Sequence, residues 1–303
     1  MSAPAQTLGG DTPRGFVFAL TAYLLWGFLP LYLKLVEHVA TLEVLAHRVV
    51  WSLPIALAVL VALGRTDSLS VAIRTPRMLG MACLTAALIS VNWGVYVWAI
   101  QTEQALEAAL GYYINPLFSI FLGAVLLGER LSPRQWAAVA LAACAVAVLT
   151  VEAGRLPLAA LTLTVSWGFY AYFKRSLPVG PNQGFTLEIL LLLPVALGYL
   201  VWLQGQGGLH LTQGGMRDAL LLLGCGVITA VPLMIYANGA KLLTLSTIAI
   251  MQYIAPTMIF LIAVFVFAEP FGTARAIAFP MIWAALVLYT SEIVGRRLRR
   301  PAR

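Results

Sequence analysis

The tetrapeptide Tyr113-Ile114-Asn115-Pro116 returns 140 residues later as Tyr253-Ile254-Ala255-Pro256. Two further matches occur at nearly the same offset. Glu129 corresponds to Glu269, and Trp26-Gly27-Phe28 corresponds to Trp167-Gly168-Phe169 at an offset of 141. A single match could arise by chance in a chain rich in leucine and alanine, but three matches at nearly one offset indicate a duplication. The chain is therefore predicted to consist of two related halves.

Most of the chain is apolar. Of its 303 residues, 61% are hydrophobic and 10% are charged, and its mean hydropathy is +0.90. About a quarter of the residues of a soluble protein are charged, so this surface is suited to lipid rather than to water. The net charge of +7 does not indicate nucleic-acid binding, because the basic residues are spread over short connections between apolar segments.

Ten apolar segments are each long enough to cross a bilayer, which takes about 20 residues of helix. We therefore predict an all-α polytopic membrane protein with ten transmembrane helices in two five-helix repeats. Because five is odd, the second repeat enters the membrane from the opposite side, so the repeats are inverted. The predicted spans are 15–35, 43–63, 77–99, 105–127, 133–151, 157–176, 184–204, 216–240, 244–268 and 274–294.

The predicted repeats cover residues 15–151 and 157–294, with a tail at residues 1–14 and a basic tail at residues 295–303. With the N-terminus inside, fourteen lysines and arginines fall in inside segments and four in outside segments. Basic loops favour the cytoplasmic side. We therefore expect both termini in the cytoplasm and a multi-pass protein in a bacterial-type cell inner membrane.

Amides, aromatic rings and one arginine within the spans are the candidates for a substrate cavity. A polar group in lipid is costly without a partner, so these side chains should face the bundle interior, where they either join helices or line a solute site. Arg48 lies close to the start of its span, so an interfacial charge that extends to the outer surface explains it best, and a role in the solute site is the alternative. Pro116 and Pro256 are predicted hinges, or simple packing kinks. The cavity candidates are Trp26, Arg48, Asn92, Tyr96, Tyr113, Asn115, Trp167, Tyr236, Gln252 and Tyr253.

Other charged residues stand near the ends of the spans. Glu43 and His47 are one helical turn apart, and Glu107 and Glu188 open later spans. Interfacial pairing with loop residues explains them best. The alternative is that His47, Arg48 or a carboxylate binds a substrate carboxylate or relays protons. Glu129 and Glu269 are expected to be structural, each tying a helix hairpin.

Several chemistries have no sequence signature here. The three cysteines, Cys83, Cys144 and Cys225, lie singly in apolar segments, and the three histidines show no metal-ligand spacing. No phosphate-binding loop, nucleophile elbow or zinc-protease motif occurs. We therefore expect no enzyme activity, no cofactor and no metal site.

Several segments together carry a family resemblance. They are residues 22–27 with Pro30 and Lys34, residues 43–52, Asn92-Trp93, residues 106–108, Gly111-Tyr112, residues 114–117, residues 127–130, residues 252–254 and Pro256-Thr257. Through them the chain resembles the drug/metabolite transporter superfamily, and within it the RarD branch of EamA-type permeases. The resemblance covers residues 15–293 and implies ten helices, two inverted EamA repeats, a central cavity open to one side at a time, and export of small metabolites, of which amino acids are the best described. It supplies no catalytic residue.

The leading hypothesis is a secondary transporter that exports amino acids or similar metabolites by alternating access. One alternative is a drug-type permease for lipophilic compounds, and another is a non-transporting membrane sensor or assembly component. The expected partners are a small-molecule substrate and membrane lipid, with no nucleic acid, and the chain is expected to act as a monomer. The sequence favours uncoupled movement, because it lacks an isolated mid-span aspartate.

Overall fold

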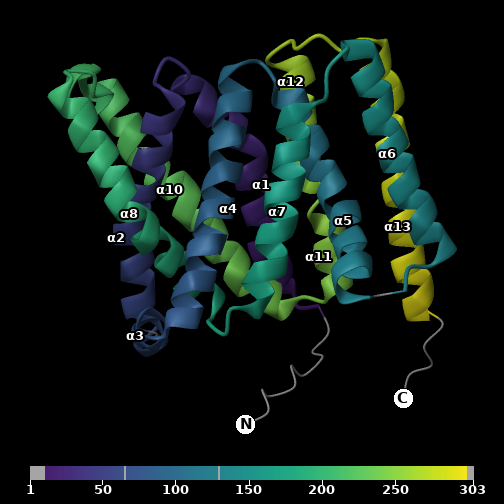
Figure 1. Ribbon diagram of the computed structural model, residues 1–303, viewed down its shortest axis with the longest axis horizontal. Helices are drawn as coiled ribbons and strands as arrows, with labels where there is room; N and C mark the ends of the chain where they lie inside the picture. The colour runs from purple at the N-terminus through teal and green to yellow at the C-terminus, as the bar shows by residue number, and fades with distance from the viewer. Residues whose placement is uncertain (1–10, 65, 129, 299–303) are drawn as a thin grey trace.

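The computed structural model describes residues 11–64, 66–128 and 130–298, and these ranges contain helices and no strands. Figure 1 shows the long helices running side by side in one bundle. The helices of the first half are α1 (Pro13–Leu35), α2 (Thr41–Ala62), α3 (Asp67–Arg74), α4 (Pro76–Gln101), α5 (Ala105–Leu127) and α6 (Pro133–Ala153). The second half contains α7 (Leu158–Ser176), α8 (Pro181–Gly205), α9 (His210–Gln213), α10 (Gly215–Gly239), η1 (Ala240–Leu242), α11 (Leu245–Met251), α12 (Ile254–Phe265) and α13 (Thr273–Leu298).

The prediction of a polytopic membrane protein is confirmed. Within the described residues, eight helices are long and apolar enough to cross a membrane: α1, α2, α4, α5, α6, α8, α10 and α13. The 19-residue α7 and the successive α11 and α12 run alongside them (Figure 1). Together these elements correspond to the ten predicted spans. The short helices α3 and α9 lie in connections between the predicted spans, where the sequence predicts no helix.

Local sequence signals set the helix boundaries. Proline stands at the start of α1, α4, α6 and α8, where its missing amide proton costs no helical hydrogen bond. Ser132 and Gln135 form a capping box before α6. At the other end, α5 and α6 stop at Gly128 and Gly154, whose φ angles of 67° and 62° are left-handed.

The ninth predicted span, residues 244–268, is not one helix. The structure divides it into α11 and α12, and Gln252 and Tyr253 lie between them. Pro256 consequently stands in the first turn of α12, whereas Pro116 lies inside the continuous α5. Proline is tolerated in a first turn and disrupts an interior one, so the two equivalent prolines have different local environments.

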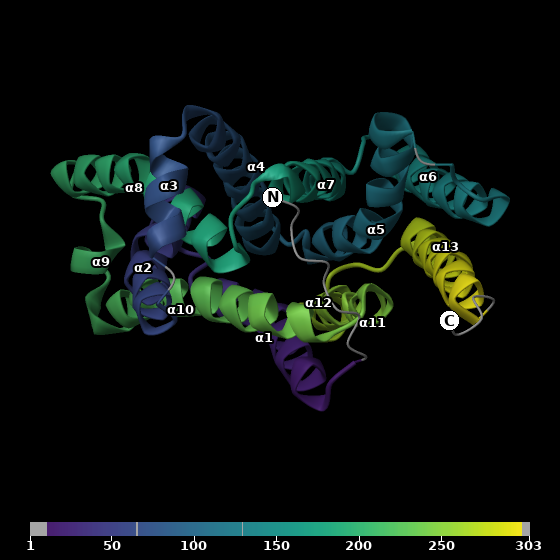
Figure 2. The ribbon, with the colours of Figure 1, turned by 90° about the horizontal axis from the view of Figure 1, so that it is seen from below.

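The helices pack in two rows. Figure 2 shows α4, α7 and α5 along one side of the bundle and α10, α1 and α12 along the other. In agreement with the picture, α7 packs against α4 and α5, and α1 packs against α10 and α12. At the two ends of the rows, α2 packs on α8 and α6 packs on α13. Each row therefore combines helices from both halves of the chain.

Glycines allow the closest approaches between these helices. A β-carbon on Gly226 of α10 would overlap the main chain of Trp51 in α2, and one on Gly111 of α5 would overlap the main chain of Ala160 in α7. Small residues let membrane helices pack this closely.

The beginning of α1 and the end of α13 lie at the same end of the bundle (Figure 1), and we call this the termini end. The other is the far end.

Candidate solute-binding site

Arg48 lies in α2 and is 3% exposed. Its Nε donates to the hydroxyl of Thr229 on α10 at 3.0 Å, and its guanidinium lies 5.0 Å from the ring centroid of Trp93 on α4. Its Nη1 has no hydrogen-bond partner within the described part of the chain. A guanidinium presents five N–H donors and always carries a positive charge. This buried cation therefore retains unused binding capacity, and it does not extend to the surface.

Asn92, Tyr112 and Tyr96 form a polar cluster beside Arg48. Asn92 of α4 is 1% exposed and donates to the Leu163 carbonyl at 3.1 Å and the Ser166 hydroxyl at 3.0 Å. Its amide oxygen accepts from the Tyr112 hydroxyl at 3.2 Å. The rings of Tyr112 and Tyr96 pack edge to face at 5.5 Å, and both side chains lie in the neighbourhood of Arg48.

The buried hydroxyl of Tyr96 has no hydrogen-bond partner among the described residues. Buried polar groups in native structures are normally satisfied, so each exception calls for an explanation. Tyr96 and Arg48 are two such exceptions in one region, and both side chains carry donors. The Arg48 guanidinium can only donate and the Tyr96 hydroxyl can donate as well, so the two together have the chemistry of a site for a carboxylate or another anion.

The remaining candidates from the sequence lie elsewhere. The Tyr113 hydroxyl hydrogen-bonds that of Thr257 on α12 at 2.7 Å, which joins α5 to the second row. Asn115 is buried, and its amide oxygen has no hydrogen-bond partner among the residues that the structure describes. Gln252 and Tyr253 lie at the break between α11 and α12.

The two equivalent tryptophans belong to separate aromatic clusters. Trp26 packs with Tyr23 and Tyr236, with ring centroids 5.4–5.6 Å apart. Trp167 packs on Tyr170, at 5.6 Å. The structure therefore brings Arg48, Asn92 and Tyr96 together and distributes the other seven candidates over the bundle.

Several interactions involve residues that the sequence did not single out. Thr229 binds the Arg48 side chain, and Tyr170 donates to Glu188 at 3.2 Å while Lys174 pairs with the same carboxylate at 2.5 Å. Glu107 lies 3.7 Å from Arg155. These pairs fit the interfacial or structural interpretation of the glutamates. Lys174 and Glu188 are close in the chain, but nothing in the sequence indicates the distant Thr229.

All three histidines lie in one cluster at the far end. Glu43 accepts from the main-chain N–H of His210 at 2.7 Å and lies 2.8 Å from its ring Nδ1. The ring of His38 lies 5.9 Å from that of His210 and binds Asp218 at 3.0 Å. His47 approaches Glu43 at 3.8 Å. Glu43 and His210 are 167 residues apart, and His38 and Asp218 are 180 apart, so no local sequence pattern indicates this cluster.

Glu269 does not tie its own hairpin. Its two carboxylate oxygens accept from the main-chain N–H groups of Ala105 and Leu106, at 2.6 and 3.0 Å, and so cap α5. Burial raises the pKa of this carboxyl, and the two N–H donors oppose the rise. The corresponding expectation for Glu129 lies outside the described residues.

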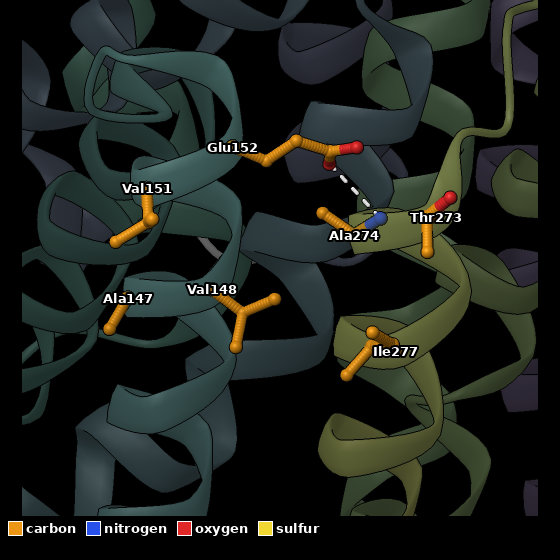
Figure 3. Close-up of a pocket in the computed structure, with 7 residues that line it drawn as sticks. All are labelled: Ala147, Val148, Val151, Glu152, Thr273, Ala274 and Ile277. Carbon is orange, nitrogen blue, oxygen red and sulfur yellow. Dashed lines mark hydrogen bonds between the residues drawn. The ribbon is translucent and has the colours of Figure 1, made fainter.

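One pocket lies between α6 and α13, away from Arg48. Figure 3 shows its lining and the hydrogen bond from the Ala274 main chain to Glu152, at 3.0 Å. None of the ten cavity candidates lines it, and its walls are mostly aliphatic. The pocket therefore suits lipid chains better than a polar solute, and the central cavity stays a prediction. Its lining residues are Ala147, Val148, Val151, Glu152, Thr273, Ala274 and Ile277.

Comparison with known proteins relates this arrangement to a family. Residues 13–151 match the EamA-like transporter family. An uncharacterized transporter of Vibrio cholerae is 42% identical over 93% of this chain and 93% of its own, and protein RarD of Escherichia coli is 38% identical over 95% of this chain and 98% of its own. A solved structure with 21% identity shares the fold, with a TM-score of 0.59 over 94% of this chain and 99% of that one. The chain is therefore a transporter that belongs to the EamA family of the drug/metabolite transporter superfamily, as a RarD-type permease.

Proposed function

We propose that this transporter exports amino acids or similar small zwitterionic metabolites, and that Arg48 binds the solute carboxylate. The observation that carries the proposal is the buried Arg48, whose Nη1 has no partner within the described residues. A charge inside a membrane protein is costly and marks a functional position by default. A solute carboxylate would supply the missing counter-charge and accept both from Arg48 and from the Tyr96 hydroxyl.

The surroundings of Arg48 support a solute with a compact polar end. Trp93 covers one face of the guanidinium, and Thr229 holds its Nε. Asn92 is held by Leu163, Ser166 and Tyr112, so it positions the Tyr112 hydroxyl next to Arg48. A planar guanidinium fixed in this way can bind a carboxylate through two parallel hydrogen bonds.

The proposed mechanism is alternating access between two inverted repeats, residues 15–151 and 157–294. It is supported by the packing, since α1 contacts α10 and α12 while the corresponding α7 contacts α4 and α5. The two sets of contacts correspond to each other under the predicted duplication, as expected for two inverted copies that can exchange their conformations. Pro116 and the break at Pro256 are the proposed flexible points. We place both termini in the cytoplasm, on the distribution of basic residues, and the proposal includes no catalytic step.

The test is a counterflow screen in proteoliposomes with labelled amino acids, their carboxamides and a set of lipophilic drugs. We expect uptake of one or more amino acids and none of the matching carboxamide, because the amide lacks the charge that Arg48 would bind. Empty liposomes are the control. Exchange of drugs alone would identify the lipophilic permease instead. Binding of an amino acid without exchange would contradict transport and favour a sensor.

A further inference from the structure

At the far end, side-chain contacts join the two rows of helices. Gln101, the last residue of α4, donates through its amide to the carbonyls of Val36 and Val39, at 3.3 and 2.9 Å. Its amide oxygen accepts from the Thr41 hydroxyl at 2.5 Å. One side chain of the α4 row thus satisfies three groups of the turn between α1 and α2.

Glu269 makes the second crossing at this end. It follows α12, which lies in the α1 row, and its carboxylate accepts from the first two N–H groups of α5, in the α4 row. The first N–H groups of a helix have no partner inside the helix, and the helix dipole favours a negative charge there. Glu269 is 4% exposed, so this contact is shielded from water and correspondingly strong.

Backbone strain lies on both sides of this contact. Glu103 and Ala268 are the non-glycine residues with positive φ among those described, at 57° and 52°. Glu103 lies two residues before the α5 amide that Glu269 binds, and Ala268 immediately precedes Glu269. Left-handed conformations are unfavourable for residues with a β-carbon and persist only where the surrounding structure holds them. The closed contact therefore keeps both connecting turns away from their relaxed conformations.

The termini end is held differently. Lys174 of α7 pairs with Glu188 of α8, and Asp11, before α1, accepts from the main chain and hydroxyl of Thr244 and Thr247 near α11. These named contacts join neighbours along one side of the bundle and do not span the two rows. Of these helix-end contacts, those that join the two rows are made by Gln101 and Glu269, and both lie at the far end.

We propose that Glu269 and Gln101 form the gate at the far end, and that solute leaves there only after both contacts open. The proposal rests on the alternating access of the proposed function. Opening releases the left-handed turns at Glu103 and Ala268, which offsets part of the lost hydrogen bonding. The gate is therefore suited to open and close, unlike an unstrained helix cap.

Cys225 provides a native reporter of opening. It lies in α10, is fully buried and lies in the neighbourhood of Arg48. A variant with Cys83→Ser and Cys144→Ser retains this thiol alone. The rate at which a membrane-impermeant methanethiosulfonate reagent modifies Cys225 from the far side then measures how often that end opens.

We expect Glu269→Ala to raise this rate about tenfold or more, since hydrogen bonds to a charged acceptor shift an equilibrium by about this factor. Gln101→Ala should raise it less, because its acceptors are neutral carbonyls. Glu269→Gln, which preserves the size of the side chain, should give an intermediate rate and guards against misfolding of the alanine variant.

Glu152→Ala is the matched control. Glu152 caps α13 as Glu269 caps α5, but it joins α6 to α13 rather than the two rows (Figure 3). Both substitutions remove a cap and should lower thermal stability similarly, whereas only the Glu269 substitutions should accelerate modification of Cys225. Equal acceleration by Glu152→Ala, or unchanged rates in both Glu269 variants, would overturn the gate. Modification needs no identified substrate, so this result is independent of the solute screen.

Discussion

Arg48 and Glu188 occupy corresponding positions in the two halves, since 140 residues separate them, as they separate the two tetrapeptides. Their helices, α2 and α8, pack against each other, and both side chains are buried. The surroundings nevertheless differ. Glu188 is paired with Lys174 and accepts from Tyr170, whereas Arg48 has a hydroxyl, an aromatic face and an unused N–H group.

This difference separates a structural charge from a binding charge. Lys174 lies over the ring of Tyr170 at 5.3 Å while it pairs with Glu188, so the second half compensates its own buried ion. Among the described residues, no carboxylate is paired with Arg48, and under the proposed function the solute carboxylate compensates its charge. Under the predicted duplication, a change of residues at one pair of equivalent positions would thus form an asymmetric site.

The largest effect should come from breaking the compensated pair. Glu188→Ala leaves the partly buried Lys174 without its carboxylate, and loss of one partner of a fully buried pair costs about 3–5 kcal/mol, which is an upper limit for this pair. We expect a large fall in the unfolding midpoint of the purified protein in detergent. The double variant Lys174→Met/Glu188→Leu should recover most of the loss, because it removes both charges. A Glu188→Ala protein as stable as wild type would mean that the pair is not structural.

The next effect concerns transport rather than stability. Arg48→Ala removes the proposed carboxylate donor, and hydrogen bonds to charged groups are worth about 1.5–3 kcal/mol, so solute flux should fall about 10- to 100-fold. Membrane insertion should be unchanged, and the unfolding midpoint should move less than in Glu188→Ala. Arg217→Ala, at an exposed position of α10, is the control. Wild-type flux in Arg48→Ala would remove the distinction between the two charges.

A smaller effect tests whether charge alone is sufficient at this position. Arg48→Lys keeps the positive charge but loses the flat group that stacks on Trp93 and the Nε bond to Thr229. Because lysine keeps the charge, we expect a smaller loss than in Arg48→Ala, about 1 kcal/mol, which corresponds to about a fivefold fall in flux. Flux equal to that of wild type would show that the planar geometry is unimportant. Flux as low as that of Arg48→Ala would show that it is essential.

The smallest effect should come from the support of the site. Tyr112→Phe removes the hydrogen bond to Asn92, whose amide keeps its bonds to Leu163 and Ser166. Side-chain hydrogen bonds in membrane proteins average about 0.6 kcal/mol, so the concentration for half-maximal flux should rise about threefold. Tyr172→Phe, whose ring packs on Phe173 of the same helix, should leave it unchanged.

The helices could be predicted from the sequence because spans in lipid must be apolar and about 20 residues long. The division of the ninth span was not predictable in this way, since Gln252 and Tyr253 interrupt the helix without lowering the hydropathy of residues 244–268 below that of a span. A proline stands at the matching position of both predicted repeats, but α5 continues through Pro116, whereas the helix is broken just before Pro256.

The site could be predicted only in part. Polarity at membrane depth correctly placed Asn92 and Tyr96 in the interior, because each is too costly to expose to lipid. The favoured interpretation of Arg48 as an interfacial charge is wrong, because the structure buries its side chain. Polarity could not show that these three side chains meet one another, or that Tyr113 and Trp26 lie in other clusters, because burial does not specify a partner. The histidine cluster and the far partner of Glu269 depend on contacts across more than 160 residues, which no local pattern encodes.

The cap that Glu269 places on α5 also has a consequence for biosynthesis. Ala105 and Glu269 are 164 residues apart, so α5 enters the membrane long before the ribosome has made the carboxylate that binds its first turn. Until then, the first N–H groups of α5 must remain near water or the lipid headgroups. The first half therefore cannot complete its fold while it is being translated, and the nascent chain acquires a finished α5 only when the last hairpin, α12 and α13, has been inserted.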